Sequence, residues 1–130
     1  MNKLTVGNVS VDRSKHSQGT IQRGAISVGT SMGGTPQEIP IIVYHGAQDG
    51  PVLWLNGATH GDEPEGPFSI FLATQAIDVS KLKGTVVAVP VMNVGAFTAG
   101  TRGDPLDTFS YDMNRVYPGR EGGYPTERAA

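Results

Sequence analysis

The sequence predicts an α/β domain, on three observations. Two short apolar runs, Val52–Leu55 and Thr85–Val89, lack alternation and are typical of strands buried on both faces. A helical pattern of apolar residues separates them, from Pro67 to about Ile77. A strand, a helix and a strand of these lengths predict a right-handed βαβ unit with parallel strands.

Two antiparallel strands are expected before this unit. Residues 1–18 are polar and are interpreted as an arm or an edge strand. Residues 19–28 alternate loosely, and residues 39–44 form a compact β-branched run. The Gly-rich segment 29–36 between them has the composition of a loop, so the three segments predict a long hairpin.

The C-terminal part is expected to be mostly loop, from residue 92 to residue 123. A loop of that length in a domain is usually functional or disordered. Thr126 to Ala130 is typical of the first turn of a helix, with Thr126 as the candidate N-cap. Because a natural domain rarely ends one turn into a helix, we expect residues 1–130 to be the N-terminal part of a single longer domain.

Composition argues against several classes of function. The chain has 130 residues and a net charge of −2, so bulk charge predicts neither nucleic-acid nor membrane binding. The absence of cysteine excludes disulfides and cysteine-type zinc sites. No apolar stretch has the length of a signal-peptide core or of a membrane helix, which needs about 20 residues. A cytoplasmic protein is therefore the expectation.

His60 and Glu63 are the most informative pair of residues. They follow the run 52–55, at the carboxyl end of a predicted parallel strand, where open α/β sheets bind ligands. Residues of these types three apart on a turn can bind one divalent metal, and Gly57 and Gly61 permit the turns this requires. A catalytic zinc usually has three protein ligands, so the pair is incomplete. The alternative is a surface histidine and a glutamate that only favours a helix start.

The long loop carries a second group of polar side chains. Asn114 and Arg115 could bind a substrate carboxylate, the arginine through two parallel hydrogen bonds. Arg102 could stabilise a developing oxyanion. The alternative is a solvated loop with polar residues at its turns. The other histidines, His45 and His16, are more typical of a strand end and a polar arm than of metal ligands.

Several runs occur in a specific order. They are residues 60–63, residues 85–90 with Asn93 and residues 96–97, Arg102, residues 112–119 and residues 126–128. In this order they resemble the succinylglutamate desuccinylase/aspartoacylase family of the zinc-carboxypeptidase-like superfamily, over about residues 20–130. The resemblance implies a mixed sheet with flanking helices. It also implies that the chain is the N-terminal half of a catalytic domain, ending after the first βαβ unit and the active-site loop.

The resemblance implies a metal site. His60 and Glu63 would be two of three ligands to Zn²⁺, and Asp112 would hydrogen-bond His60 and fix its tautomer. Zinc would activate a water that attacks an amide carbon. The family's third ligand, a later histidine, and its general base, a later glutamate, have no counterparts in this sequence.

The resemblance also implies substrate contacts. Arg102 would be the catalytic group that polarises the scissile carbonyl, and Asn114 and Arg115 would hold the substrate carboxylate. Met113 stands where leucine is usual, a volume-conserving difference. The implied activity is a zinc-dependent deacylase for a small N-acylated amino acid or related amine. The alternatives are a metallocarboxypeptidase acting on peptides, and an inactive fragment with partial metal binding. Because a truncated sheet leaves one strand edge unpaired, self-association through that edge is also expected.

Overall fold

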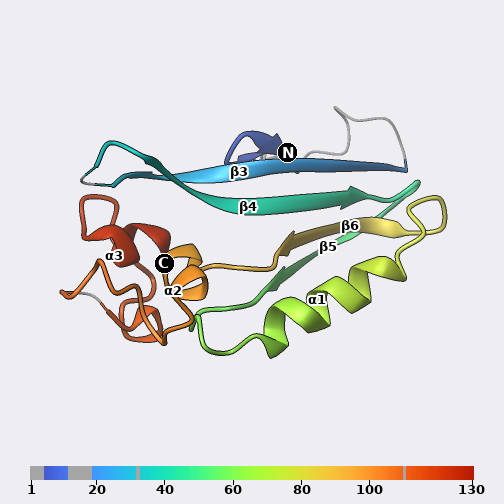
Figure 1. Cartoon of the computed structure of the whole chain (residues 1–130). Helices are drawn as coiled ribbons and strands as arrows, with labels where there is room; N and C mark the ends of the chain where they lie inside the picture. The colour runs from blue at the N-terminus through green and yellow to red at the C-terminus, as the bar shows by residue number, and fades with distance from the viewer. Residues whose placement is uncertain (1–4, 12–18, 32, 110) are drawn as a thin grey trace.

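The computed structural model describes residues 5–11, 19–31, 33–109 and 111–130 (Figure 1). This part of the chain combines a β-sheet with helices, which confirms the α/β prediction. In chain order the elements are β1 (Thr5–Val6), β2 (Val9–Ser10), β3 (Thr20–Thr30), β4 (Pro36–His45), β5 (Gln48–Asn56), α1 (Glu65–Gln75), β6 (Lys83–Val89), α2 (Val94–Ala99), the 3-10 helix η2 (Met113–Arg115) and α3 (Pro125–Ala129).

The N-terminal part forms two antiparallel pairs. β1 and β2 make a small two-stranded sheet within the predicted arm, of which residues 1–4 and 12–18 lie outside the described residues. β3 and β4 pair from Thr20 opposite His45 to Thr30 opposite Pro36, which confirms the predicted long hairpin.

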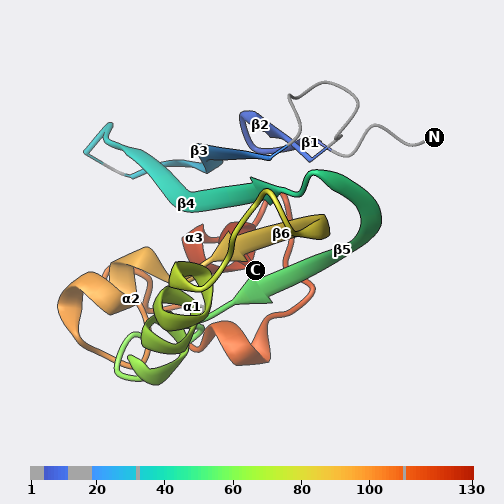
Figure 2. The same cartoon turned by 90° about the vertical axis from the view of Figure 1, so that its right-hand side faces the viewer.

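The four longer strands form one mixed sheet in the order β3-β4-β6-β5. β4 and β6 are antiparallel, whereas β5 and β6 are parallel and are connected through α1. Parallel neighbours need such a crossover, because a tight turn would reverse the chain direction. The predicted β-α-β unit with parallel strands is therefore confirmed (Figures 1 and 2).

Successive side chains of β4 point to opposite faces of the sheet, so the apolar residues of this strand contribute to a core on each face. One face carries the larger cluster of buried aliphatic residues: Val9, Val11, Ile39, Ile41, Val43, Val87 and Val89. The other face packs against α1 through a smaller cluster: Tyr44, Ile70, Val86 and Ala88.

The prediction that residues 52–55 form a central strand buried on both faces is wrong. β5 is the last strand of the sheet, and β6 is its neighbour. Val52 is 54% exposed, Leu53 53% and Trp54 41%. The apolar side chains of residues 52–55 are suited to burial on both faces of the strand. Within the described residues, however, no further element covers these faces.

The predicted helix is confirmed as α1, which begins two residues before the predicted start at Pro67, but most of its large apolar residues are exposed. Phe68, Phe71 and Leu72 recur at helical spacing and are nevertheless more than half exposed. Ile70 and Thr74 are the buried positions, and the Thr74 hydroxyl donates to the Ile70 carbonyl at 2.8 Å. The most apolar side of α1 therefore faces away from the sheet.

The segment after β6 is mostly loop, as predicted, with the short helices α2 and η2 inside it. At α3 the predicted cap is wrong, because Tyr124 and not Thr126 is the N-cap. Pro125 takes the first helical position, where its missing N–H is tolerated, so the helix begins earlier. The Thr126 N–H donates instead to Asp107 Oδ2 at 2.8 Å.

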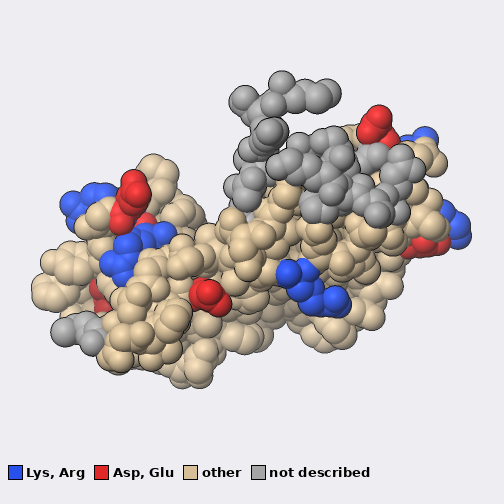
Figure 3. Space-filling model, turned by 90° about the horizontal axis from the view of Figure 1, so that it is seen from above, with Lys and Arg blue, Asp and Glu red and all other residues tan. Residues whose placement is uncertain are grey.

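Figure 3 shows acidic and basic side chains in small groups, some of mixed and some of single sign, separated by uncharged surface on the face seen from above. None of the helices in the described part of the chain is long and apolar enough to cross a membrane.

Candidate functional site

The turn that follows β5 is held in place by backbone contacts. The Asn93 N–H donates to the Ala58 carbonyl at 3.0 Å, and the Gly61 N–H donates to the Arg102 carbonyl at 3.3 Å. A Cβ at Gly61 would overlap the backbone of Ala96, so only glycine fits this close approach to α2. The turn, and with it His60, is therefore fixed between the carboxyl end of β5 and α2.

His60 lies between two carboxylates. Its Nδ1 is 3.1 Å from Glu63 Oε1, and its Nε2 is 2.8 Å from Asp112 Oδ1. His60 is 5% exposed, whereas the Glu63 side chain is 57% exposed. The buried imidazole thus has a carboxylate next to each nitrogen, and the carboxylate next to Nδ1 belongs to an exposed side chain.

Asp112 links the histidine to the long loop. Besides His60, it accepts from the Asn114 N–H at 3.0 Å and from Arg102 Nε at 3.3 Å. The hydrogen bond from His60 is the main cause that lowers the pKa of Asp112, with smaller contributions from the Asn114 N–H and the Arg102 charge, against partial burial. Asp112 is therefore an anionic acceptor on the far side of the imidazole.

Arg102 completes the cluster. Its Nη1 is 3.6 Å from Glu63 Oε1, so the guanidinium contacts both carboxylates that flank His60. The arginine lies 39 residues after Glu63 and 10 before Asp112, and no periodicity in the sequence links the three positions. The two ion pairs of Arg102 are the feature of the site that sequence reasoning did not foresee.

The side chains of Asn114 and Arg115 stay apart from this cluster, although the backbone N–H of Asn114 donates to Asp112. Both residues are exposed, and Arg115 Nη1 donates to the Asn114 carbonyl at 3.3 Å. Neither side chain is hydrogen-bonded to His60, Glu63 or Arg102. His45 ends β4 and is buried, in agreement with the interpretation as a strand-end residue, and His16 lies outside the described residues.

The cluster fits half of a zinc site. Two ligands of one tetrahedral zinc stand about 3.3 Å apart, close to the 3.1 Å between His60 Nδ1 and Glu63 Oε1. A carboxylate on the other nitrogen, as Asp112 provides, is the usual partner of a metal-binding histidine. Within the described residues, however, no group of three His, Cys, Asp or Glu side chains is arranged to hold a metal.

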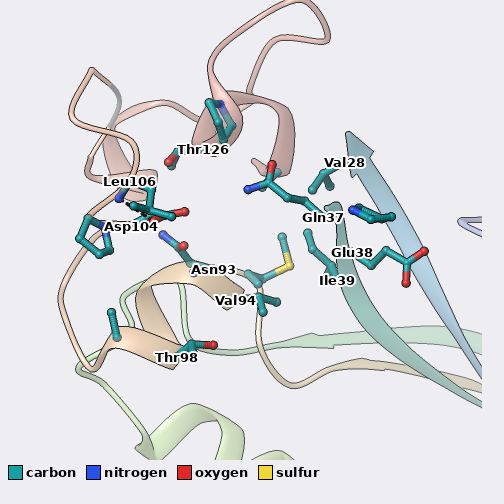
Figure 4. Close-up of a pocket in the computed structure, with 17 residues that line it drawn as sticks. Val28, Gln37, Glu38, Ile39, Asn93, Val94, Thr98, Asp104, Leu106 and Thr126 are labelled. Atoms are coloured by element: carbon teal, nitrogen blue, oxygen red, sulfur yellow. Dashed lines mark hydrogen bonds between the residues drawn. The ribbon is translucent and has the colours of Figure 1, made fainter. Parts of the chain in front are cut away.

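A cavity lies elsewhere in the described structure. It has a volume of about 610 Å³ and lies between α2, α3 and the hairpin β3–β4 (Figure 4). Val28, Ile39 and Leu106 contribute to its largely apolar lining. None of the predicted site residues lines it, so the cavity does not mark the metal site.

The comparisons with known proteins identify the family. Residues 49–130 match the family model of the succinylglutamate desuccinylase/aspartoacylase catalytic domain, a range that includes the whole cluster. An N-alpha-acetyl-L-2,4-diaminobutyric acid deacetylase from Halomonas elongata is 37% identical over 92 residues, which cover 71% of this chain and 26% of that protein.

Solved structures agree in fold. The product-bound ectoine utilization protein EutE (DoeB) from Ruegeria pomeroyi has a TM-score of 0.74 at 32% identity, and an aspartoacylase family protein from Mesorhizobium loti has 0.73 at 29%. Each match covers 85% of this chain and 34% of the other chain. The chain thus spans about a quarter of the curated relative and a third of these structures. It belongs to the succinylglutamate desuccinylase/aspartoacylase family.

Proposed function

We propose that the chain is the N-terminal part of a single catalytic domain that hydrolyses the amide bond of a small N-acylated amino acid or related amine with the help of zinc. The observation that carries the proposal is the buried His60 held between the carboxylates of Glu63 and Asp112. Two similarities to known proteins support the proposal. The family model matches a range that includes the cluster, and a similar protein is a deacetylase of an N-acetylated amino acid.

His60 and Glu63 would hold the metal through Nδ1 and a carboxylate oxygen. When bound, zinc supplies a Lewis acid that polarises a carbonyl and lowers the pKa of water. Asp112 accepts a hydrogen bond from Nε2–H and so leaves the Nδ1 lone pair free for a metal. The aspartate thereby selects the tautomer that metal binding requires.

Arg102 would stabilise negative charge on the carbonyl oxygen of the substrate. Its guanidinium already lies beside Glu63, so it can reach an oxygen next to the metal ligands. Asn114 and Arg115 would take the substrate carboxylate, since both are exposed on the loop that carries Asp112. The third metal ligand and the general base would come from residues beyond this chain.

Metal retention tests the proposal directly. We expect the chain to take up zinc more weakly than a complete three-ligand site and to lose that binding in His60→Ala and Glu63→Gln. Glu65→Gln is the matched control, because Glu65 is an exposed acid two residues further on, in the first turn of α1. Zinc binding is measured by competition with a chromophoric chelator. Equal zinc affinity in wild type, His60→Ala and Glu63→Gln would remove both residues from the metal site.

Substrate hydrolysis tests the remaining part of the proposal. With zinc added, we expect this chain alone to leave N-acetylated amino acids intact, because the general base is missing. Turnover by residues 1–130 alone would contradict the proposed division of the catalytic domain.

A further inference from the structure

The turn that carries His60 has a backbone conformation that must be held by its surroundings. Ala58, two residues before His60, has a φ of 48°, in the left-handed region that residues with a Cβ rarely adopt. Such a conformation costs free energy and persists only where neighbouring contacts fix it. The direction of the His60 ring therefore depends on the residues that pack against this turn.

Asn93 holds the start of the turn through its backbone. It follows β6, is 4% exposed, and its N–H donates to the Ala58 carbonyl at 3.0 Å. The preceding N–H, of Met92, donates to the Gly57 carbonyl at 2.9 Å. These two carbonyls belong to the peptide units on either side of Ala58. The segment after β6 thus fixes the backbone of the left-handed residue from both sides.

The side chain of Asn93 holds the other end of the turn through α2. Asn93 is the N-cap of this helix, and its Oδ1 accepts from the Ala96 N–H at 3.2 Å. Ala96 is fully buried, and Gly61 lies so close to its backbone that a Cβ at Gly61 would overlap it. The Asn93 side chain therefore fixes α2 at the residue that Gly61 contacts.

The cap is important because α2 is short. The helix has six residues, Val94–Ala99, and a helix of this length is not stable by itself. The first N–H groups of a helix have no partner within it, and the Asn93 side chain satisfies one of them. Without this acceptor the first turn of α2 opens more often, and the surface on which Gly61 packs opens with it.

We propose that Asn93 is a positioning residue for His60, acting through Ala58 at one end of the turn and through Ala96 and Gly61 at the other. The proposal rests on the proposed function, since it takes His60 as a metal ligand. Asn93 acts on the imidazole through the backbone of the turn. What it maintains is the contact between His60 Nε2 and Asp112 Oδ1, which are 2.8 Å apart.

Neutral substitutions separate the effect of the cap from a general loss of stability. Asn93→Ala removes the acceptor for the Ala96 N–H, whereas Asn93→Ser keeps an N-cap acceptor. Serine also removes Asn93 Nδ2, a buried donor with no hydrogen-bond partner in the described part of the chain. Ser31→Ala is the matched control, because the Ser31 hydroxyl accepts from the Thr35 N–H at 3.2 Å in the loop between β3 and β4.

The ring N–H of His60 that lies toward Asp112 is the readout, in the metal-free chain. Its exchange with water is measured by NMR of isotope-labelled protein, and His60→Ala identifies the signal. Loss of a helix cap shifts a local equilibrium about fivefold, so we expect about fivefold faster exchange in Asn93→Ala. Exchange in Asn93→Ser and Ser31→Ala should stay within about twofold of wild type. If Asn93→Ala does not fold, Asn93→Gly replaces it, since glycine is tolerated at N-caps.

Unchanged exchange in the folded Asn93→Ala chain would overturn the proposal. So would an equal increase in Ser31→Ala or in Asn93→Ser, because the effect would then follow overall stability or the amide itself and not the cap. An unprotected ring N–H in the wild type would also overturn it, since the contact with Asp112 would then not persist.

Zinc affinity separates this proposal from the proposed function. We expect binding about tenfold weaker in Asn93→Ala, as for other residues that orient a metal ligand. Equal affinity in Asn93→Ala and wild type would overturn the role of Asn93 toward the metal site. A wild-type chain with no affinity for zinc would contradict the proposed function, whereas the ring N–H, measured without metal, still decides whether Asn93 positions His60.

Discussion

At the scale of single residues, the state of His60 is set by what its two nitrogens contact. Asp112 Oδ1 lies 2.8 Å from Nε2 and Glu63 Oε1 lies 3.1 Å from Nδ1, and the Asp112 side chain is the less exposed of the two carboxylates. Arg102 pairs with both of them. A proton on Nε2 would be shared with the nearer and more buried Asp112, and it would leave the lone pair of Nδ1 toward the exposed Glu63.

Asp112→Asn tests this arrangement. An amide at this position accepts a weaker hydrogen bond from His60 and no longer pairs with Arg102, so we expect zinc affinity to fall by about 10- to 100-fold. Chelator competition measures the change. Asp62→Asn is the control, because Asp62 is an exposed acid on the same turn. An effect of equal size in Asp62→Asn would mean that net charge, and not the contact with His60, controls the affinity.

The sequence predicted part of this cluster. The spacing of His60 and Glu63 on one turn was enough to predict that their side chains lie together, because residues three apart on a turn are close in space whatever the fold. Asp112 and Arg102 reach them only because α2 packs on Gly61 and returns the long loop to the turn. The path of the long loop back to the turn depends on tertiary packing, which local patterns do not predict. The expected role of Asp112 therefore came from the family resemblance. The contacts of Arg102 with Glu63 and Asp112 were not predicted.

At the scale of elements, α3 is a short helix fixed by a few specific contacts. Glu127 accepts from the Tyr124 N–H at 2.7 Å, within a capping box, and also pairs with Arg120 at 3.1 Å. Arg128 holds the helix to β3, because its Nε donates to the Val28 carbonyl at 2.7 Å. A five-residue helix would not persist alone, so these contacts determine where the C-terminal segment lies.

The capping contacts make the stability of α3 depend on pH. The Tyr124 N–H is the main cause that lowers the pKa of Glu127, followed by Arg120. A lowered folded-state pKa contributes stability above the usual value of 4.5, and this contribution is lost as the pH falls through the folded-state pKa. We therefore expect Glu127→Gln to be less stable than wild type at neutral pH and nearly equal to it well below pH 4.5.

Urea denaturation at both pH values measures this difference. Glu121→Gln is the matched control, since Glu121 is an exposed acid in the same loop. A constant difference between Glu127→Gln and wild type across the pH range would show that the carboxylate charge does not stabilise the cap.

The prediction of elements succeeded in type, and the predicted burial is confirmed for β6 but wrong for β5. The positions of the hairpin β3–β4 and of the unit β5–α1–β6 follow from local patterns of two and 3.6 residues, which the sequence states directly. Burial depends on which other elements pack against a strand or helix, and local patterns do not state this. Within the described residues no element packs against the outer side of β5 or of α1, so their apolar residues are exposed although their patterns are typical of buried elements.

At the scale of the whole molecule, the two edges of the sheet differ. β3 is followed outward by the small sheet of β1 and β2, whose Val9 belongs to the main core, whereas β5 ends the sheet with three large apolar residues exposed. The chain corresponds to about a third of the matched structures in length. The apolar residues therefore fall into two groups: buried residues that form the core, and large residues of β5 and α1 that are exposed.

Two substitutions on adjacent residues of α1 test this separation. Ile70 is buried in the cluster with Tyr44 and Val86, so we expect Ile70→Ala to lower the free energy of unfolding by about 2–5 kcal/mol. Phe71 is 56% exposed, so Phe71→Gln should change it by no more than about 0.5 kcal/mol while reducing the fluorescence of a bound hydrophobic dye.

Urea denaturation and dye titration measure the two effects. A loss of stability in Phe71→Gln as large as that in Ile70→Ala would mean that the exposed side of α1 is part of the core of the single chain.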